Sequence, residues 1–224
     1  MSLIRVHQVT KLYGRFAALR QVSADFEGGR LYGIFGENGA GKSTLLRLLA
    51  GLAQPTSGTI EFDPHIQEHG ARGSLGYMAH ASMLYDEFSA MENLRYFGSL
   101  YGIHDERLVK NAIEQVGLNP LLERRVGHYS QGMRQRLSLA RAFLHDPRIL
   151  LLDEPFSNLD VNGAGDISRL LGTWRDAGKC ILVVTHQIAQ LERITDESML
   201  LSCGEVAARA PGTGVLQAAQ GAAV

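Results

Sequence analysis

The sequence predicts an α/β fold: a parallel-sheet core with an antiparallel β part at the N-terminus and an inserted helical subdomain. The runs Ile149–Leu152 and Ile181–Val184 are apolar at consecutive positions, which is typical of parallel strands covered on both faces. A glycine-rich segment follows an earlier apolar run, Leu31–Phe35, and precedes a short helical pattern. Residues 81–147 instead place apolar side chains at helical intervals. These observations together predict a sheet core interrupted by helices.

The core is predicted in two parts, residues 1–80 and 148–206, within a single domain of 224 residues. The first part contains a strand at Leu31–Phe35 and a helix from Thr44 to Ala50, which Gly51 ends. The insertion, residues 81–147, ends at Asp146-Pro147. Its helical pattern rests on seven apolar residues: Tyr96, Leu100, Leu108, Ile113, Val116, Leu137 and Leu144. Residues 207–224 are mostly small and offer little to bury, so we expect a loose tail there.

Composition is that of an ordinary globular protein. Hydrophobic residues make up 45% of the chain and charged residues 20%, and the formal net charge of −1 gives no reason to expect a nucleic-acid partner. Two cysteines, Cys180 and Cys203, do not suggest a disulfide framework. The N-terminus is too polar for a secretory signal, and no stretch approaches the roughly 20 apolar residues that span a bilayer. We therefore expect a cytoplasmic protein that needs a partner for any membrane role.

The glycine-rich segment fits the P-loop pattern G-x-x-x-x-G-K-[ST] and lies between a predicted strand and a predicted helix. Its glycines allow backbone N–H groups to surround phosphate oxygens, and the helix N-terminus adds its positive end. Lys42 is expected to reach the β- and γ-phosphates of ATP, and the Ser43 hydroxyl to bind Mg²⁺. The predicted nucleotide-binding residues here are Gly36, Glu37, Asn38, Gly39, Ala40, Gly41, Lys42, Ser43 and Thr44. The fold class is therefore that of a P-loop NTPase with a RecA-like core.

A P-loop needs an acidic partner at the end of a neighbouring strand. The run Ile149–Leu152 is followed by Asp153 and Glu154. Asp153 is expected to hold Mg²⁺, which is the Walker B role, and Glu154 to act as general base on the attacking water. A charged strand end is common for one acid alone, but Asp-Glu-Pro after such a strand, in a chain with a P-loop, favours the catalytic interpretation.

Further motifs resemble those of the ABC (ATP-binding cassette) ATPases. The segment Tyr129–Arg136 resembles their LSGGQ signature, with Tyr for Leu, Gln for the first Gly and Met for Gln. Ser157–Asp160 resembles the D-loop, His186 the switch histidine, and Tyr13 the aromatic residue that stacks on adenine. The order of the motifs is also that of the family, and the resemblance extends from about Val6 to Cys203. It implies ATP hydrolysis with Mg²⁺, in which His186 joins Lys42 and Glu154 at the γ-phosphate.

The signature segment predicts half of a phosphate site. Ser130 is a good N-cap, and an apolar stripe follows it at Met133, Leu137, Ala140 and Leu144. That helix N-terminus has a hydroxyl and backbone N–H groups but no lysine. The resemblance implies that Ser130 and Gly132 complete the ATP site of an opposite subunit, either a second copy of this chain or a paralogous cassette. It also implies a transmembrane permease as partner, and a position on the inner face of the cell membrane.

One residue departs from the family pattern. The family usually ends the strand near Gly76–Ala79 with a glutamine that senses Mg²⁺ and meets the membrane partner, whereas this chain has His80. Histidine at this position resembles the ATP-binding subunits of haem exporters in cytochrome c maturation, which makes haem or a related cargo one hypothesis. We consider His80 a candidate neighbour of Mg²⁺. Alternatively, it only fills space beside Tyr77.

Two other functions are possible for a chain with these motifs, a non-transport ATPase and a cassette that binds ATP without hydrolysis. A non-transport ABC ATPase usually carries long coiled coils between its Walker motifs, or two cassettes in one chain, and neither pattern is present here. A binding-only cassette is disfavoured because Lys42, Asp153 and Glu154 are intact. His65 and His69 are expected to be solvated loop residues rather than metal ligands, because Pro64 and Gly70 bracket them.

Overall fold

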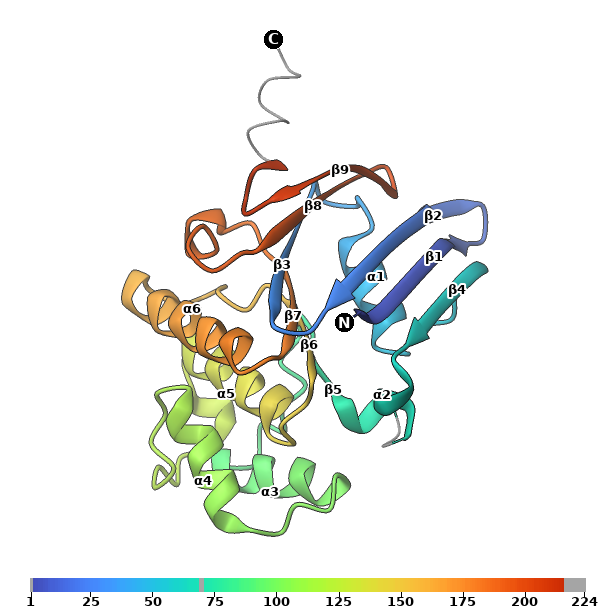
Figure 1. Cartoon of the computed structure of the whole chain (residues 1–224). Helices are drawn as coiled ribbons and strands as arrows, with labels where there is room; N and C mark the ends of the chain where they lie inside the picture. The colour runs from blue at the N-terminus through green and yellow to red at the C-terminus, as the bar shows by residue number, and fades with distance from the viewer. Residues whose placement is uncertain (1, 69–70, 216–224) are drawn as a thin grey trace.

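The computed structural model describes residues 2–68 and 71–215, and these form two sheets and a group of helices (Figure 1). The larger sheet has six strands in the order β5-β6-β7-β3-β8-β9. Its strands are β3 (Arg30–Phe35), β5 (Leu75–Met78), β6 (Ile149–Asp153), β7 (Cys180–Val184), β8 (Glu197–Ser202) and β9 (Glu205–Pro211). All neighbouring pairs are parallel except β8 and β9, which are antiparallel. The predicted parallel core is confirmed.

Consecutive residues of the central strands pack on opposite faces of this sheet. In β7, for example, Ile181 and Val183 join one hydrophobic cluster while Leu182 and Val184 join another. Because side chains alternate along a strand, continuous apolar runs are what a sheet covered on both faces requires. The parallel register pairs Leu152 with Val183 and brings the carboxyl ends of β6 and β7 together.

The N-terminal part forms the predicted antiparallel sheet. β1 (Ser2–Tyr13) lies between β2 (Phe16–Glu27) and β4 (Ser57–Phe62) and is antiparallel to both. The helix α1 (Lys42–Leu49) buries its leucines in the same cluster as Phe26 of β2 and Leu151 of β6. One face of the large sheet is thus covered by α1 and the small sheet. The short helix α2 (Pro64–Glu68) and a 3₁₀ turn at Ala71–Ser74 connect β4 to β5.

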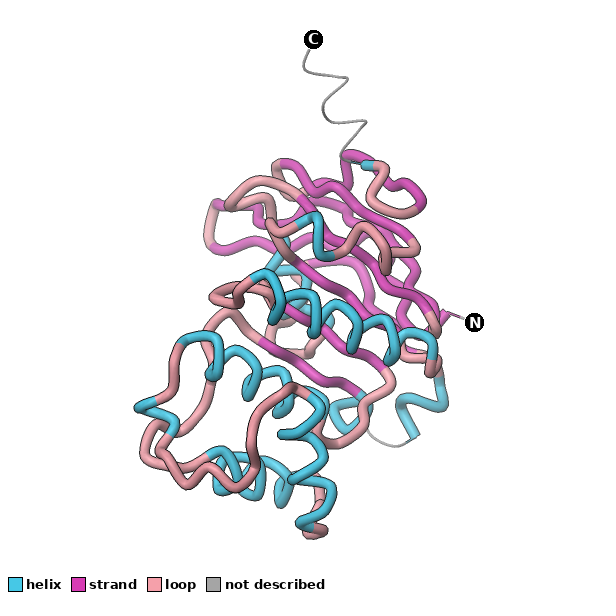
Figure 2. The backbone as a smooth tube through the Cα atoms, turned by 90° about the vertical axis from the view of Figure 1, so that its left-hand side faces the viewer, coloured by secondary structure: helices cyan, strands magenta, loops and turns pink. Residues whose placement is uncertain are grey.

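Helices lie between β5 and β6 in the chain and gather at one end of the molecule (Figures 1 and 2). They are α3 (Ala90–Leu100), α4 (Glu106–Gln115) and α5 (Gln131–Phe143), with a 3₁₀ turn at Val126–His128. A capping box starts α3: Ser89 accepts from the N–H of Glu92, whose carboxylate accepts from the N–H of Ser89. Tyr96, Leu100 and Leu108 fit the helical period but are exposed, so this part of the apolar pattern does not mark the core.

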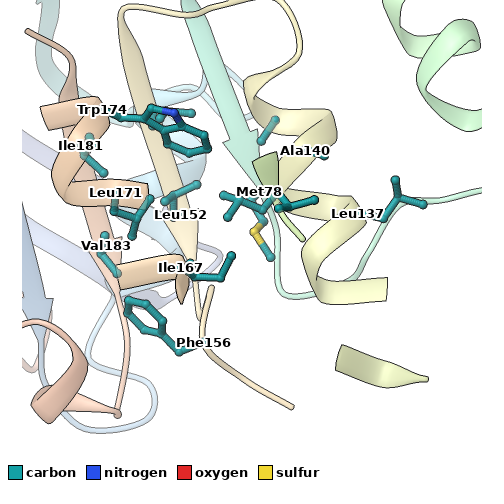
Figure 3. Packing of buried hydrophobic residues seen from close by; sticks show 14 of the residues in the cluster. Met78, Leu137, Ala140, Leu152, Phe156, Ile167, Leu171, Trp174, Ile181 and Val183 are labelled. Carbon is teal, nitrogen blue, oxygen red and sulfur yellow. The ribbon is translucent and has the colours of Figure 1, made fainter. Parts of the chain in front are cut away.

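The remaining face of the large sheet is covered by α5 and by α6 (Val161–Asp176). Figure 3 shows Trp174 and Leu171 of α6 near Leu152 and Ile181 of the sheet, with Met78 of β5 near α5. The Trp174 ring stacks on Phe143 of α5, with centroids 3.8 Å apart. Another 3₁₀ turn, Ile188–Gln190, follows β7. This continuous cluster joins the helical part to the sheet.

The structure differs from the prediction of a loose tail from residue 207 onward. Residues 207–211 belong to β9, which pairs with β8, and Val215 is fully buried. Backbone pairing along β8, rather than large side chains, orders this small-residue segment. The rest of the predicted tail, residues 216–224, and His69 lie outside the described residues. No helix among the described residues is long and apolar enough to cross a membrane.

Candidate nucleotide-binding and hydrolysis site

A pocket of about 520 Å³ opens where β3, β6 and β7 end. The carboxyl ends of parallel strands are the usual place for a ligand in an open α/β sheet. The pocket brings together residues from the P-loop, the loop after β5 and the ends of β6 and β7. Its lining consists of Phe16, Ala18, Asn38, Gly39, Gly41, Lys42, Ser43, Thr44, His80, Asp153, Glu154, Ser157, Val184 and His186.

Lys42 is a buried cation at the floor of this pocket. Its Nζ donates to the carbonyl oxygens of Gly36, at 2.7 Å, and Glu37, at 2.9 Å. Burial lowers the pKa of the Lys42 ammonium group, while the negative charges of Glu154 and Asp153 act in the opposite direction. The P-loop therefore curls round its own lysine, and these carbonyls fix the position of its charge.

Two glycines allow the P-loop to take this shape. Gly36 has φ +142°, and a Cβ there would lie 2.2 Å from the Leu201 carbonyl oxygen. Gly41 has φ +104°, and a Cβ there would lie 2.5 Å from the Ala18 carbonyl oxygen. Both positions need a backbone conformation and a close approach that only glycine permits.

Gly41 is also the N-cap of α1, and no side chain caps this helix. The first N–H groups of a helix have no partner within it, so those of α1 are available to an anion in the pocket. An uncapped helix N-terminus beside a buried lysine is well suited to a polyphosphate. This donor arrangement fits the phosphate groups of ATP.

The carboxylates predicted from the run Ile149–Leu152 lie at the same edge of the sheet. Asp153 is the buried last residue of β6, and Glu154 follows it with its backbone in the left-handed region, at φ +54°. The Glu154 N–H donates to the carbonyl oxygen of Val184 at 2.8 Å. The Glu154 side chain meets His186, whose N–H donates to Oε2 at 3.3 Å and whose Nε2 lies 3.5 Å from Oε1.

The same pocket contains oxygen donors that suit Mg²⁺. Ser43 and Asp153 both line it, and a hydroxyl with one carboxylate leaves several positions of an octahedral ion for phosphate oxygens and water. Within residues 2–68 and 71–215, no group of three or more His, Cys, Asp or Glu side chains could hold a metal by itself. The residues thus fit an ion that binds together with a phosphate ligand. Exposed His80 lies at this pocket too.

The signature segment forms a second helix N-terminus. Ser130 is the N-cap of α5, and its Oγ accepts from the N–H of Met133 at 3.2 Å, as predicted. A Cβ on Gly132 would lie 2.9 Å from the carbonyl oxygen of Asn158, so this glycine packs closely on the segment after β6. Ser130 is exposed, and neither it nor Gly132 lines the pocket that the described residues form.

Comparison with known proteins identifies the family. The family described as "ABC transporter" matches residues 19–157. The chain belongs to the ABC transporter family. The ABC transporter ATP-binding protein NatA of Bacillus subtilis is 36% identical over 196 residues, which cover 84% of this chain and 80% of NatA. The bacitracin transport ATP-binding protein BcrA of Bacillus licheniformis is 33% identical over 216 residues, covering 94% of this chain and 70% of BcrA.

Solved ABC structures share the fold over nearly the whole chain. An ATP-binding subunit of an ABC transporter superposes with a TM-score of 0.85 at 27% identity, covering 98% of this chain and 94% of that one. A dimeric post-hydrolysis cassette with bound ADP and Pi gives a TM-score of 0.83 at 26% identity, covering 93% and 98%. This chain is accordingly an ATP-binding and ATP-hydrolysing ABC protein.

Not every predicted site residue of this ABC protein lines the pocket. Of the P-loop residues, Gly36, Glu37 and Ala40 are not part of the lining, and the carbonyl oxygens of Gly36 and Glu37 accept from Lys42 instead. Tyr13 lies beside the pocket, exposed, at the end of β1 and paired with Phe16 across the β1–β2 turn. Phe16 lines the pocket and was not predicted. The signal that could have found it is the turn at Gly14-Arg15, which places these aromatic residues opposite each other.

Proposed function

We propose that the chain drives transport through a separate membrane subunit, by closing with a second cassette around ATP and opening again after hydrolysis. The pocket that unites Lys42, Asp153, Glu154 and His186 carries the proposal. The printed names of NatA and BcrA, which describe transporter ATP-binding proteins, and the dimeric structure with ADP and Pi support it. The transported substrate stays open: export of haem or a related cargo remains a prediction from His80.

In this proposal the charged and hydroxyl residues of the pocket have separate roles. Lys42 and the N–H groups at the start of α1 hold the β- and γ-phosphates. Glu154 accepts a proton from the water that attacks the γ-phosphate, and His186 orients the Glu154 carboxylate. Ser43 and Asp153 would hold Mg²⁺, and His80 lines the same pocket. The ion would neutralise charge on the phosphate oxygens.

The start of the signature helix supports a shared site. At this helix N-terminus Ser130 is exposed and Gly132 is half-buried, and neither residue lines its own chain's pocket. A helix N-terminus favours negative charge, so a second cassette could bring its own bound ATP against it. We propose that two cassettes, identical or paralogous, pair in this head-to-tail sense. Tyr13 and Phe16 would then contact the nucleotide base from the β1–β2 turn.

A second groove, of about 650 Å³, is the proposed docking place of the membrane subunit. It runs between α1, β5, α3 and the end of α5, and its rim exposes Leu52, Met83 and Leu100. Arg141 lies in it, and no carboxylate of the described residues pairs with its guanidinium, whose pKa is lowered by burial. An amphipathic segment with an acidic side chain would complement both features. Such docking would hold the cassette on the inner face of the membrane.

Membrane association tests this function. The chain is expressed with and without a candidate membrane subunit, and its share in washed membranes is measured together with ATPase activity. We expect both to rise when the membrane protein is present, and Leu100→Glu to prevent the rise. Leu121→Glu is the matched control, because Leu121 is also an exposed leucine but lies outside the groove. If Leu100→Glu and Leu121→Glu associate equally with the membrane, the groove is not the docking place. If the parent chain does not associate with the membrane even when the membrane protein is present, the transport role is wrong.

A further inference from the structure

The helix α5 buries a glutamine that contacts the proposed base. Gln135 is only 7% exposed, and its Nε2 donates to the backbone carbonyl oxygen of Glu154 at 2.6 Å. A buried amide that loses its partner costs free energy, so this bond fixes where Gln135 lies. It also links two segments that are 19 residues apart in the chain: the helix that begins at the signature and the residue after Asp153.

The backbone of Glu154 needs such support. A non-glycine residue at φ +54° is strained and keeps this conformation only where its surroundings hold it. The Glu154 N–H is held by Val184, and its carbonyl oxygen accepts from Gln135 and from the Ser157 hydroxyl at 2.9 Å. The peptide groups on both sides of the Glu154 side chain are therefore fixed. Among these bonds, the one from Gln135 comes from the helical part of the molecule.

We propose that Gln135 is a positioning residue for hydrolysis, acting through the backbone of Glu154 without touching the nucleotide. This inference rests on the proposed role of Glu154 as base. Gln135 is absent from the lining of the nucleotide pocket in the described part of the chain, so its removal leaves the phosphate-binding groups in place. Rotation of the Glu154 peptide would move the carboxylate away from the attacking water. Hydrolysis thereby depends on the placement of α5, whose first residues carry the signature.

The main test compares Gln135→Met with Ser138→Ala. Methionine is close to glutamine in size but cannot donate a hydrogen bond. Ser138 is also buried in α5 and donates to a backbone carbonyl, that of Ser82 at 2.8 Å, so Ser138→Ala removes a similar bond that does not involve Glu154. For Gln135→Met we expect kcat to fall by about 10- to 100-fold with KM for ATP within about twofold, since misplacement of a reacting group costs this much. Ser138→Ala should leave kcat within about twofold.

A double variant separates positioning from general destabilisation. If Gln135 acts through Glu154, then Gln135→Met should cause no further loss in a Glu154→Gln chain, measured by single-turnover hydrolysis of radiolabelled ATP. An equal loss in both backgrounds would overturn the inference, as would an unchanged kcat in Gln135→Met alone. Normal turnover of Glu154→Gln itself would instead overturn the proposed base, which keeps the two failures distinct.

A second substitution covers the case in which Gln135→Met fails to fold. Gln135→Glu keeps the shape of the side chain, and its carboxyl can donate only when protonated. We expect the kcat of Gln135→Glu, relative to the parent chain, to rise as pH falls from about 8 to 6, because a buried carboxyl takes up its proton above the usual range. If Gln135→Glu has the same kcat as the parent chain throughout this pH range, the inference is overturned.

Discussion

His186 contacts the Glu154 carboxylate with both its backbone and its ring: its N–H donates to Oε2 at 3.3 Å, and its Nε2 lies 3.5 Å from Oε1. Contacts to both oxygens restrict rotation of the carboxylate about its last bond. The Glu154 side chain is only 15% exposed whereas the His186 side chain is 57% exposed, so a largely buried acid contacts a histidine that solvent reaches. This restraint suits the role of base that we propose for Glu154.

Replacement of Glu154 by glutamine should separate ATP binding from turnover. The amide cannot accept the proton of the attacking water, so we expect hydrolysis to fall by about 10²–10⁴-fold while ATP binding persists. The unhydrolysed nucleotide should also trap a dimer that size-exclusion chromatography with light scattering detects. Glu205→Gln, which changes an exposed carboxylate of β9, is the control and should behave as the parent. Normal phosphate release by Glu154→Gln would remove this residue from the mechanism.

Mixing two inactive variants tests the shared site. Ser130→Arg spoils the signature and Lys42→Ala the P-loop, yet a heterodimer of the two retains one composite site with both parts intact. We therefore expect the mixture to hydrolyse ATP faster than either variant alone. Two different affinity tags confirm that heterodimers form. If confirmed heterodimers are no more active than the separate variants, the signature does not act on the partner's nucleotide.

His80 should influence the metal requirement if it lies beside Mg²⁺. A glutamine amide can also bond to metal-bound water, so His80→Gln should keep a similar Mg²⁺ dependence, within about threefold, whereas His80→Ala should need more Mg²⁺ for half-maximal ATPase activity. His128→Ala, an exposed histidine in the helical part, serves as control. An unchanged Mg²⁺ dependence in His80→Ala would favour the alternative, in which His80 only fills space beside Tyr77.

His145 should make the fold sensitive to mild acid. Burial lowers its pKa below the ordinary 6.5, and the nearby cations Lys179 and Arg141 lower it further, against the hydrogen bond to Leu75 and the charge of Asp146. The ring stacks on Tyr101 with centroids 3.9 Å apart, and its Nδ1 has no partner among the described residues. The unfolded chain therefore takes up the proton first. The neutral His145 ring therefore contributes fully to the stability of the folded state above about pH 6.5, and this contribution is lost as pH falls below that value.

Thermal melting of His145→Gln against the parent from pH 8 to 5 measures this effect. The glutamine variant should melt at a lower temperature at pH 8, because the ring stack is lost. The difference in Tm should then shrink as pH falls, because protonation of His145 favours unfolding of the parent whereas glutamine does not titrate. His128→Gln, which changes an exposed ring, is measured as the control substitution. A difference between His145→Gln and the parent that stays constant from pH 8 to 5 would mean that the His145 imidazole does not titrate with unfolding.

Much of the site was predictable because its parts are local in sequence. The P-loop contains its own glycines and lysine, and the acids come directly after a strand whose four apolar residues mark it as central. Strand ends of a parallel sheet meet at one edge, so Asp153 and His186 could be placed with Lys42 without knowing the strand order. The N-cap Ser130 was also predictable from its residue type and from the spacing of the apolar residues that follow it.

Other features depend on contacts that no local pattern reveals. Phe16 reaches the pocket only because β1 and β2 form a hairpin that ends there. Gln135 resembles any polar residue on an exposed helix face, and only the packing of α5 on the sheet buries it against Glu154. Helical periodicity places Leu100 correctly in a helix but does not reveal that its side chain lines a groove rather than the core.

The apolar pattern of strand β6 does not by itself fix the register of the strand in the sheet. Side chains of Ile149–Leu152 are completely buried on both faces, so sliding the strand by one residue would exchange one leucine-lined face for another at small hydrophobic cost. The same slip would carry Asp153 and Glu154 out of their places. Burial of apolar surface therefore does little to choose the alignment of this strand. Side-chain volumes and the polar bonds of Glu154 must choose it, so a design that kept only the apolar pattern of β6 could fold with the two acids displaced.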